Sequence, residues 1–164
     1  MLKRIALVVA LLVVGAIVLF AAIQLVPYGK DHTNLPVVQE PNWDSQTTRA
    51  LVKAACFDCH SNETVWPWYS NIAPVSWLVA RDVFEGREKL NFSEWGLREM
   101  ETDEIFETTQ EGEMPPVLYL IQHPEARFSQ AEKQALLQGI QATFGGDGES
   151  GGGSEDGGGQ EKDD

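Results

Sequence analysis

Residues 56–60 read Cys56-Phe57-Asp58-Cys59-His60, and they contain the only two cysteines of the 164-residue chain. Cys-x-x-Cys followed directly by His is the attachment sequence of c-type haem. The spacing suits this chemistry, because two thiols three positions apart at a helix end can add to the two vinyl groups of one porphyrin. The next residue can then direct its imidazole to the iron, and histidine is the common axial ligand. The motif predicts covalent attachment through Cys56 and Cys59, with His60 as the proximal iron ligand.

The two cysteines also allow other interpretations. Outside the cytoplasm, paired cysteines usually form disulfides, so a structural module with a Cys56–Cys59 disulfide and no haem is one alternative. A thioredoxin-like redox pair would need a βαβ setting, which the sequence does not indicate. A structural zinc site needs four ligands, and His123 is the residue that could be added to Cys56, Cys59 and His60.

The N-terminal region contains an uncharged run of 22 residues from Ile5 to Val26. This length is sufficient for a helix to cross a bilayer core of about 30 Å. A cleaved signal peptide has a shorter apolar region of roughly 7–15 residues, so we predict an uncleaved signal anchor over residues 1–26. Lys3 and Arg4 precede the run, and such charges stay in the cytoplasm. We therefore expect a single-pass protein of the cytoplasmic membrane, with its C-terminal domain on the periplasmic or extracellular side.

Three further segments are expected after the anchor. Residues 27–41 contain three prolines, which predicts an extended spacer that lifts the domain from the membrane. Residues 145–164 have nine glycines and no apolar side chain, and this composition predicts a disordered acidic tail. Residues 42–144 then form one haem-binding domain, small enough that its own core is marginal. A bound porphyrin would supply apolar volume at its centre.

Helical signals dominate the predicted domain, and no run of alternating apolar residues indicates a sheet. We therefore predict an all-α, cytochrome c-like domain of short helices and long loops around the cofactor, with its first and last helices packed together. The expected helices begin with a cap at Asp44 or Ser45, with Pro74, with a cap at Thr102 before a stop at Gly112, and with a capping box from Ser129 to Glu132.

The formal charge of the chain is −13. Residues 27–144 are acidic even without the tail, since they hold eighteen acidic and nine basic side chains. This balance excludes nucleic acid as a partner, because phosphate binding needs a basic face. Redox partner proteins with a basic surface would be attracted electrostatically.

A second axial ligand is predicted at Met114, within Gly112-Glu113-Met114-Pro115-Pro116. The prolines restrict the backbone, so this loop could hold a thioether against the iron. His123 is the alternative distal ligand. The choice has a functional consequence, because methionine ligation raises the reduction potential. An open sixth position would instead favour a haem-based gas or peroxide sensor, or a peroxidase-like enzyme.

Aromatic residues follow the attachment motif closely and could line the haem pocket, because indole rings pack on porphyrin edges and their N–H groups can donate to propionates. The candidate pocket residues also include an arginine that could pair with a propionate and a proline whose carbonyl could orient the proximal imidazole. The complete set is Trp66, Trp68, Tyr69, Pro74, Trp77 and Arg81.

The chain resembles the bacterial haem-binding domain family over roughly residues 30–143. The resemblance rests on the sequence blocks Cys56–Thr64, Trp66–Ser70, Ile72–Leu78, Asp82–Arg87, Leu90–Trp95, Gly112–Pro116 and His123–Arg127. It implies one covalent haem c with His60 as the proximal ligand, in a small domain that is often membrane-anchored. The expected function is single-electron transfer by a membrane-anchored monohaem cytochrome c, a carrier rather than a catalyst, with unidentified redox partners.

Overall fold

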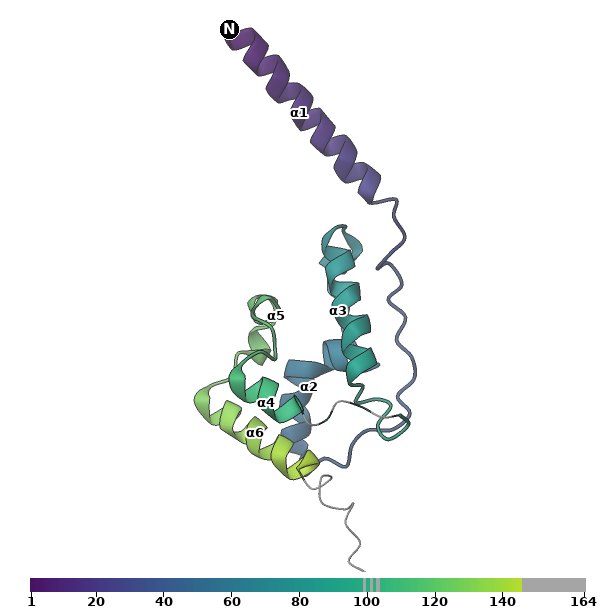
Figure 1. Cartoon of the computed structure of the whole chain (residues 1–164), viewed down its shortest axis with the longest axis vertical. Coiled ribbons are helices and arrows are strands. Elements are labelled where there is room, and N and C mark those ends of the chain that lie inside the picture. Colours follow the sequence, from purple (N-terminus) through teal and green to yellow (C-terminus); the bar gives the residue numbers. More distant parts are fainter. Residues whose placement is uncertain (99, 101, 103, 146–164) are drawn as a thin grey trace, which may run out of the picture.

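The computed structural model describes residues 1–98, 100, 102 and 104–145, and its regular structure is helical (Figure 1). Within these residues the only strand-like pairing is a single bridge between Gln39 and Glu94. The α-helices and the two 3-10 helices (η) are, in chain order, α1 Leu2–Ile23, α2 Gln46–His60, η1 Trp68–Asn71, α3 Val75–Lys89, α4 Glu104–Glu111, α5 Val117–Gln122, η2 Pro124–Ala126 and α6 Gln130–Phe144. The all-α class is confirmed. The predicted tail lies, apart from Gly145, outside the described residues.

Helix α1 stands away from the rest of the chain (Figure 1). It has 22 residues, a mean hydropathy of 3.1 in its most apolar window, and no buried residue. A rise of 1.5 Å per residue gives a length of about 33 Å, which matches a bilayer core of about 30 Å. The helix is therefore long and apolar enough to cross a membrane.

The caps of α2 and α6 follow from their local sequences. Ser45 precedes α2, and its hydroxyl accepts the Thr48 N–H at 3.1 Å. Ser129 and Glu132 form the expected capping box at the start of α6. These side chains satisfy N–H groups that the first helical turn leaves without partners, so both helices begin where the sequence predicts.

Helices α2 and α6 pack together, as expected for the first and last helices of the domain. They approach closely at Gly139, where an added Cβ would lie 2.1 Å from Thr48 Oγ1. Helix α4 packs on α6 as well. The buried core beside these helices consists of Val52, Phe57, Leu90, Phe92, Ile105, Leu136 and Ile140.

The segment predicted as a spacer, residues 27–41, is extended but packed onto the domain. Asn34 donates to Thr64 O at 2.9 Å, and the Val38 N–H donates to Ser93 O at 2.9 Å. Gly29 lies so close to α3 that an added Cβ would be 2.6 Å from Ser76 O. Residues 27–41 are therefore bonded to the domain at several points, while most of their side chains stay exposed.

Candidate haem-attachment site

His60 is the last residue of α2, and its imidazole is oriented by two backbone carbonyls. Its Nδ1 lies 2.9 Å from Gly86 O and 3.2 Å from Leu90 O. A carbonyl can only accept, so Nδ1 carries the proton and Nε2 keeps a free lone pair. Burial also lowers the pKa of His60, which favours the neutral ring. A neutral imidazole with its second nitrogen fixed in this way is the arrangement found for metal-ligating histidines.

Pro74 does not supply the carbonyl that orients His60, although the sequence suggested it. Pro74 O accepts the Trp77 N–H at 3.1 Å inside the first turn of α3. The acceptor is Gly86, three turns further along the same helix. An added Cβ at Gly86 would lie 2.6 Å from Cys59 O, so the absence of a side chain lets α3 approach the end of α2.

The thiols of Cys56 and Cys59 are free in this structure, so the disulfide alternative gains no support from it. Burial raises the pKa of both thiols to about 12. The negative charges of Asp58 and Asp82 add to the effect at Cys59. Catalytic redox cysteines have a lowered pKa instead. A neutral sulfur, as in a thioether, is therefore the state that this environment favours.

A metal site built only from protein side chains is absent from the described part of the chain. Residues 1–98, 100, 102 and 104–145 contain no group of three or more His, Cys, Asp or Glu residues that could hold a metal ion. Zinc thiolate sites also need deprotonated sulfur, which the raised thiol pKa opposes. The zinc alternative therefore has no support in this structure.

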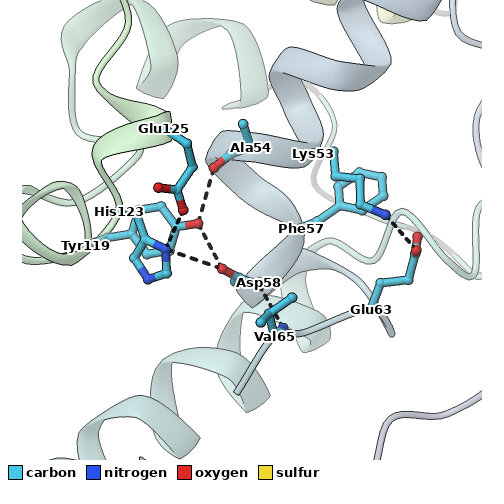
Figure 2. A pocket seen from close by; sticks show the side chains of 9 residues that line it. All are labelled: Lys53, Ala54, Phe57, Asp58, Glu63, Val65, Tyr119, His123 and Glu125. Carbon is cyan, nitrogen blue, oxygen red and sulfur yellow. Dashed lines mark hydrogen bonds and ion pairs between the residues drawn. The ribbon is translucent and has the colours of Figure 1, made fainter. Parts of the chain in front are cut away.

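His123 lies beside Asp58, which is a residue of the attachment motif (Figure 2). Its Nδ1 is 3.0 Å from Glu125 Oε1 and 3.8 Å from Asp58 Oδ2, and its ring stacks on Tyr119 at 3.9 Å. Successive helical residues are about 100° apart, so Asp58 and His60 project to nearly opposite sides of α2. His123 therefore lies on the side of α2 that faces away from the His60 imidazole.

A small cavity of about 190 Å³ borders this cluster and is also lined by Lys53, Phe57 and Glu63. Pockets for small organic ligands measure about 300–1,000 Å³. The cavity is too small for a porphyrin, and it belongs to the Asp58 side of α2.

Met114 lies between α4 and α5, after a turn that Gly112 makes with φ of 79°. Its backbone N–H donates to Thr108 O at 3.1 Å, and the residue is 40% exposed. Met100 differs, because it packs against the buried core. Of the two methionines within the domain, Met114 is thus the one whose sulfur is not already used in packing the core.

The predicted pocket aromatics have different surroundings. Trp66 stacks on His32 at 4.4 Å. Among the residues that the structure describes, the buried indole N–H groups of Trp66 and Trp77 find no hydrogen-bond partner. Trp68 is 76% exposed and contacts Tyr69 edge-on at 5.8 Å. The pKa of Tyr69 is raised by burial and by the negative charge of Asp58.

Of the two other candidate pocket residues, Pro74 is exposed, and Arg81 is exposed and paired within its own helix. Arg81 Nη2 lies 3.1 Å from Asp82 and Nε lies 3.8 Å from Glu85. Sequence reasoning missed Arg87, which donates to Ser61 O and Thr64 Oγ1, both at 2.8 Å. Arg87 thereby fixes the chain that leaves His60. No sequence pattern indicated this role for Arg87, which is simply an arginine near the end of α3.

These residues fit a haem. Buried donors without partners are costly and call for an acceptor, and carboxylates such as the haem propionates could serve the indole N–H groups of Trp66 and Trp77. The open Nε2 of His60 suits an iron atom, and the same helix carries the neutral thiols of Cys56 and Cys59. The fold and the site together define a small helical haem-binding domain that follows an apolar N-terminal helix.

Comparison with known families agrees with this class. Residues 18–142 match the haem-binding domain family, and the chain belongs to that family. No curated protein and no solved structure matches the chain.

Proposed function

We propose that the protein is a membrane-anchored monohaem c-type cytochrome that transfers single electrons between partner proteins outside the cytoplasm. The observation that carries the proposal is the 2.9 Å contact from His60 Nδ1 to Gly86 O. It leaves Nε2 available at the helix end where both thiols lie. Bound haem would supply an iron atom that alternates between the ferric and ferrous states.

Covalent attachment of haem would use the two cysteines as neutral thiols. Cys56 and Cys59 would hold the porphyrin by its two vinyl groups, since adding each S–H across one double bond would form a C–S bond and place the hydrogen on the neighbouring carbon. No oxidant is consumed. The product is a thioether without charge, and this suits the buried surroundings that raise the pKa of Cys56 and Cys59 to about 12. Gly86 and Leu90 meanwhile hold the proton on Nδ1 of His60.

Met114 is our proposed distal ligand. Two observations favour it over His123: Met114 is 40% exposed with no core to pack, and His123 is bound to Glu125 on the Asp58 side of α2. Methionine opposite histidine would raise the reduction potential. The N-terminal charges Lys3 and Arg4 support a cytoplasmic N-terminus for α1.

The proposal is tested with the full chain produced in cells that mature c-type cytochromes. The measurements are the mass of the denatured chain and the absorption spectrum of the ferric protein. We expect haem mass to remain on the denatured chain and the ferric spectrum to be low-spin. Loss of haem on denaturation would overturn covalent attachment. A high-spin ferric spectrum with fast carbon monoxide binding to the ferrous protein would replace electron transfer by the sensor or peroxidase-like alternative.

The distal ligand is tested with matched conservative variants. Met114→Leu should abolish the near-infrared sulfur-to-iron charge-transfer band, whereas Met100→Leu should keep it. Leucine conserves volume at either site, which limits the structural cost to under about 1.5 kcal/mol. A band that survives Met114→Leu would assign the distal position to another sulfur, such as that of Met100. A low-spin wild-type spectrum that lacks the band would instead return His123 to consideration.

A further inference from the structure

The residue that follows α1 is hydrogen-bonded directly to the domain. Gln24 Oε1 accepts the Ala73 N–H and Gln24 Nε2 donates to Ala73 O, both at 3.0 Å. Ala73 itself is fully buried. This two-sided pairing holds the start of α3 beside the end of α1.

The chain after Gln24 reinforces the same arrangement. His32 Nε2 lies 3.2 Å from both Gly29 O and Ser70 O, and its ring stacks on Trp66. With Gly29 itself against α3 at Ser76, the connection is fastened to the domain within a few residues of the helix end. The domain therefore has a defined orientation relative to α1.

This orientation decides which face of the domain lies at the membrane boundary. Because α1 matches the thickness of a bilayer core, Gln24 and its partner Ala73 lie at the level of the lipid headgroups. Figure 1 shows that η1 and the first turn of α3 form the end of the domain that points toward α1. The large apolar side chains here are unusually exposed: Tyr28 47%, Trp68 76%, Ile72 37% and Val75 42%. We name these four residues the membrane-proximal rim.

Charge distinguishes most of the rim from the rest of the domain. Residues 64–80, which include Trp68, Ile72 and Val75, contain no charged side chain, in a chain with 25 acidic and 12 basic residues. A charged group near Tyr28 is the ammonium of Lys30, which donates to Gln24 O. An acidic surface is repelled by anionic lipids, so the uncharged stretch is the part of this protein suited to a membrane surface. Tryptophan and tyrosine are also enriched at the membrane–water interface, where their amphipathic rings sit among the headgroups.

We propose that the membrane-proximal rim is a lipid-contacting surface that seats the haem-binding domain on the bilayer. The proposal rests on the proposed anchoring by α1 and deepens it, because it replaces a freely tethered domain by one held in a single pose. Electron-transfer partners would then approach the domain from its sides or from its far end.

Lipid contact by the rim is tested with spin labels on the full chain in lipid nanodiscs, by measuring how often each label collides with small molecules. The reporter is Asn71→Cys, an exposed polar position in η1 that leaves all four rim residues intact. Glu107→Cys on α4 is the aqueous control, and Leu12→Cys in the middle of α1 reports the anchor. Wild-type protein treated with the same label gives the background from Cys56 and Cys59.

The measured quantity is the ratio of label collisions with oxygen, which partitions into lipid, to collisions with a water-soluble nickel complex. We expect this ratio to be several-fold higher at position 71 than at 107, and highest at 12. Trp68→Ser with Ile72→Ser, or Gln24→Ala alone, should lower the ratio at 71 toward the control.

Each contrary result has a separate meaning. Equal ratios at 71 and 107, with position 12 still in lipid, would overturn the rim and leave the anchor standing. Loss of both collision partners at 71 would place the position inside protein and also overturn the rim. A water-like ratio at 12 would instead show that α1 does not span the bilayer, and both proposals would fail.

Discussion

The two halves of the domain that meet at His60 are built differently. The closed half lies around α2, α4 and α6, where aromatic rings pack on one another; these are Trp43, Phe57, Phe92, Trp95 and Phe144. The open half consists of α3 and α5, which make no contact with each other. Ala80 and Val83 of α3 are buried, but several large apolar side chains of the two helices stay exposed, namely Leu78 at 52%, Val117 at 71%, Leu118 at 77% and Ile121 at 56%.

The difference shows in which half the protein's own side chains are enough to bury the apolar surface. The closed half buries its core without help. The open half carries apolar surface of a kind that soluble proteins seldom leave exposed. In a member of a haem-binding family, a large apolar cofactor between such helices would supply the missing contacts.

The largest expected effect is a difference in unfolding free energy between a substitution in the closed half and one in the open half. Phe92→Ala should cost about 3–5 kcal/mol in free energy of unfolding, because it empties the centre of the aromatic core. Leu118→Ala should change the haem-free protein by under about 0.5 kcal/mol, because the side chain is exposed. Denaturant unfolding in detergent measures both.

The same Leu118→Ala variant should lose more stability in the haem-loaded protein than in the haem-free protein. Similar losses for Phe92→Ala and Leu118→Ala in the haem-free protein would contradict the division into halves. No extra loss on loading would show that Leu118 does not cover the cofactor.

The thiols of Cys56 and Cys59, on α2 where the two halves meet, should make the free energy of unfolding depend on pH. Their pKa is about 12 in the folded chain against 9.0 for the ordinary thiol. Above pH 9 the unfolded state therefore loses thiol protons that the folded state keeps, so stability falls as pH rises. At pH 10 each thiol should cost roughly 1.4 kcal/mol, or roughly 3 kcal/mol for both.

Unfolding of the haem-free protein at pH 8 and pH 10 measures this loss, with Cys56→Ser plus Cys59→Ser as the control. The control should lack the thiol part of the loss. The haem-loaded wild type should lack it too, since thioethers do not titrate. A wild-type loss no larger than that of the double variant would disprove the burial of neutral thiols.

Gly86 joins the halves, and Gly86→Ala should destabilise the protein by about 1–3 kcal/mol. Alanine favours a helix over glycine by about 1 kcal/mol. The clash wins, because the added Cβ meets the backbone carbonyl of Cys59 at 2.6 Å and no side-chain rotation relieves it. The variant should also disturb the His60 Nδ1 contact and shift the reduction potential.

Gly15→Ala is the matched control, since nothing lies within 4 Å of an added Cβ there. It should leave the potential unchanged. A Gly86→Ala protein with wild-type stability and potential would show that the close approach of α3 to α2 does not position His60.

Features with local causes could be predicted from the sequence. The caps Ser45 and Ser129 need only the next three or four residues, and both helices began as expected. Helix α5 was missed, because its six residues are too few for an apolar periodicity to appear. Its two preceding prolines suggested an extended loop instead.

Features with tertiary causes could not be predicted. The acceptor for His60 lies 26 residues away at Gly86, and only a helix crossing brings the two together. The packing of residues 27–41 depends in the same way on partners far along the chain, such as Thr64 for Asn34. Prolines show that a segment is extended, but they do not show what it lies against.

The smallest expected effect on stability comes from removing the Tyr119 hydroxyl, which bonds to the Asp58 side of α2. Tyr119 donates its hydroxyl to Asp58 Oδ2 at 3.0 Å and also lies 3.2 Å from Ala54 O. Tyr119→Phe should therefore cost about 1 kcal/mol, the usual net value of one hydrogen bond. Tyr28→Phe, at an exposed position, is the control and should be neutral within about 0.5 kcal/mol.

Tyr119 belongs to α5 in the open half, but its hydroxyl bonds to Asp58, which projects to nearly the opposite side of α2 from His60. Tyr119→Phe should therefore leave the haem spectrum and the reduction potential unchanged. Denaturant unfolding and a redox titration of the haem-loaded protein check the two parts separately. A shifted potential would show that the Asp58 side is coupled to the iron. The division at α2 would then have to include Tyr119 and His123 in the surroundings of the haem.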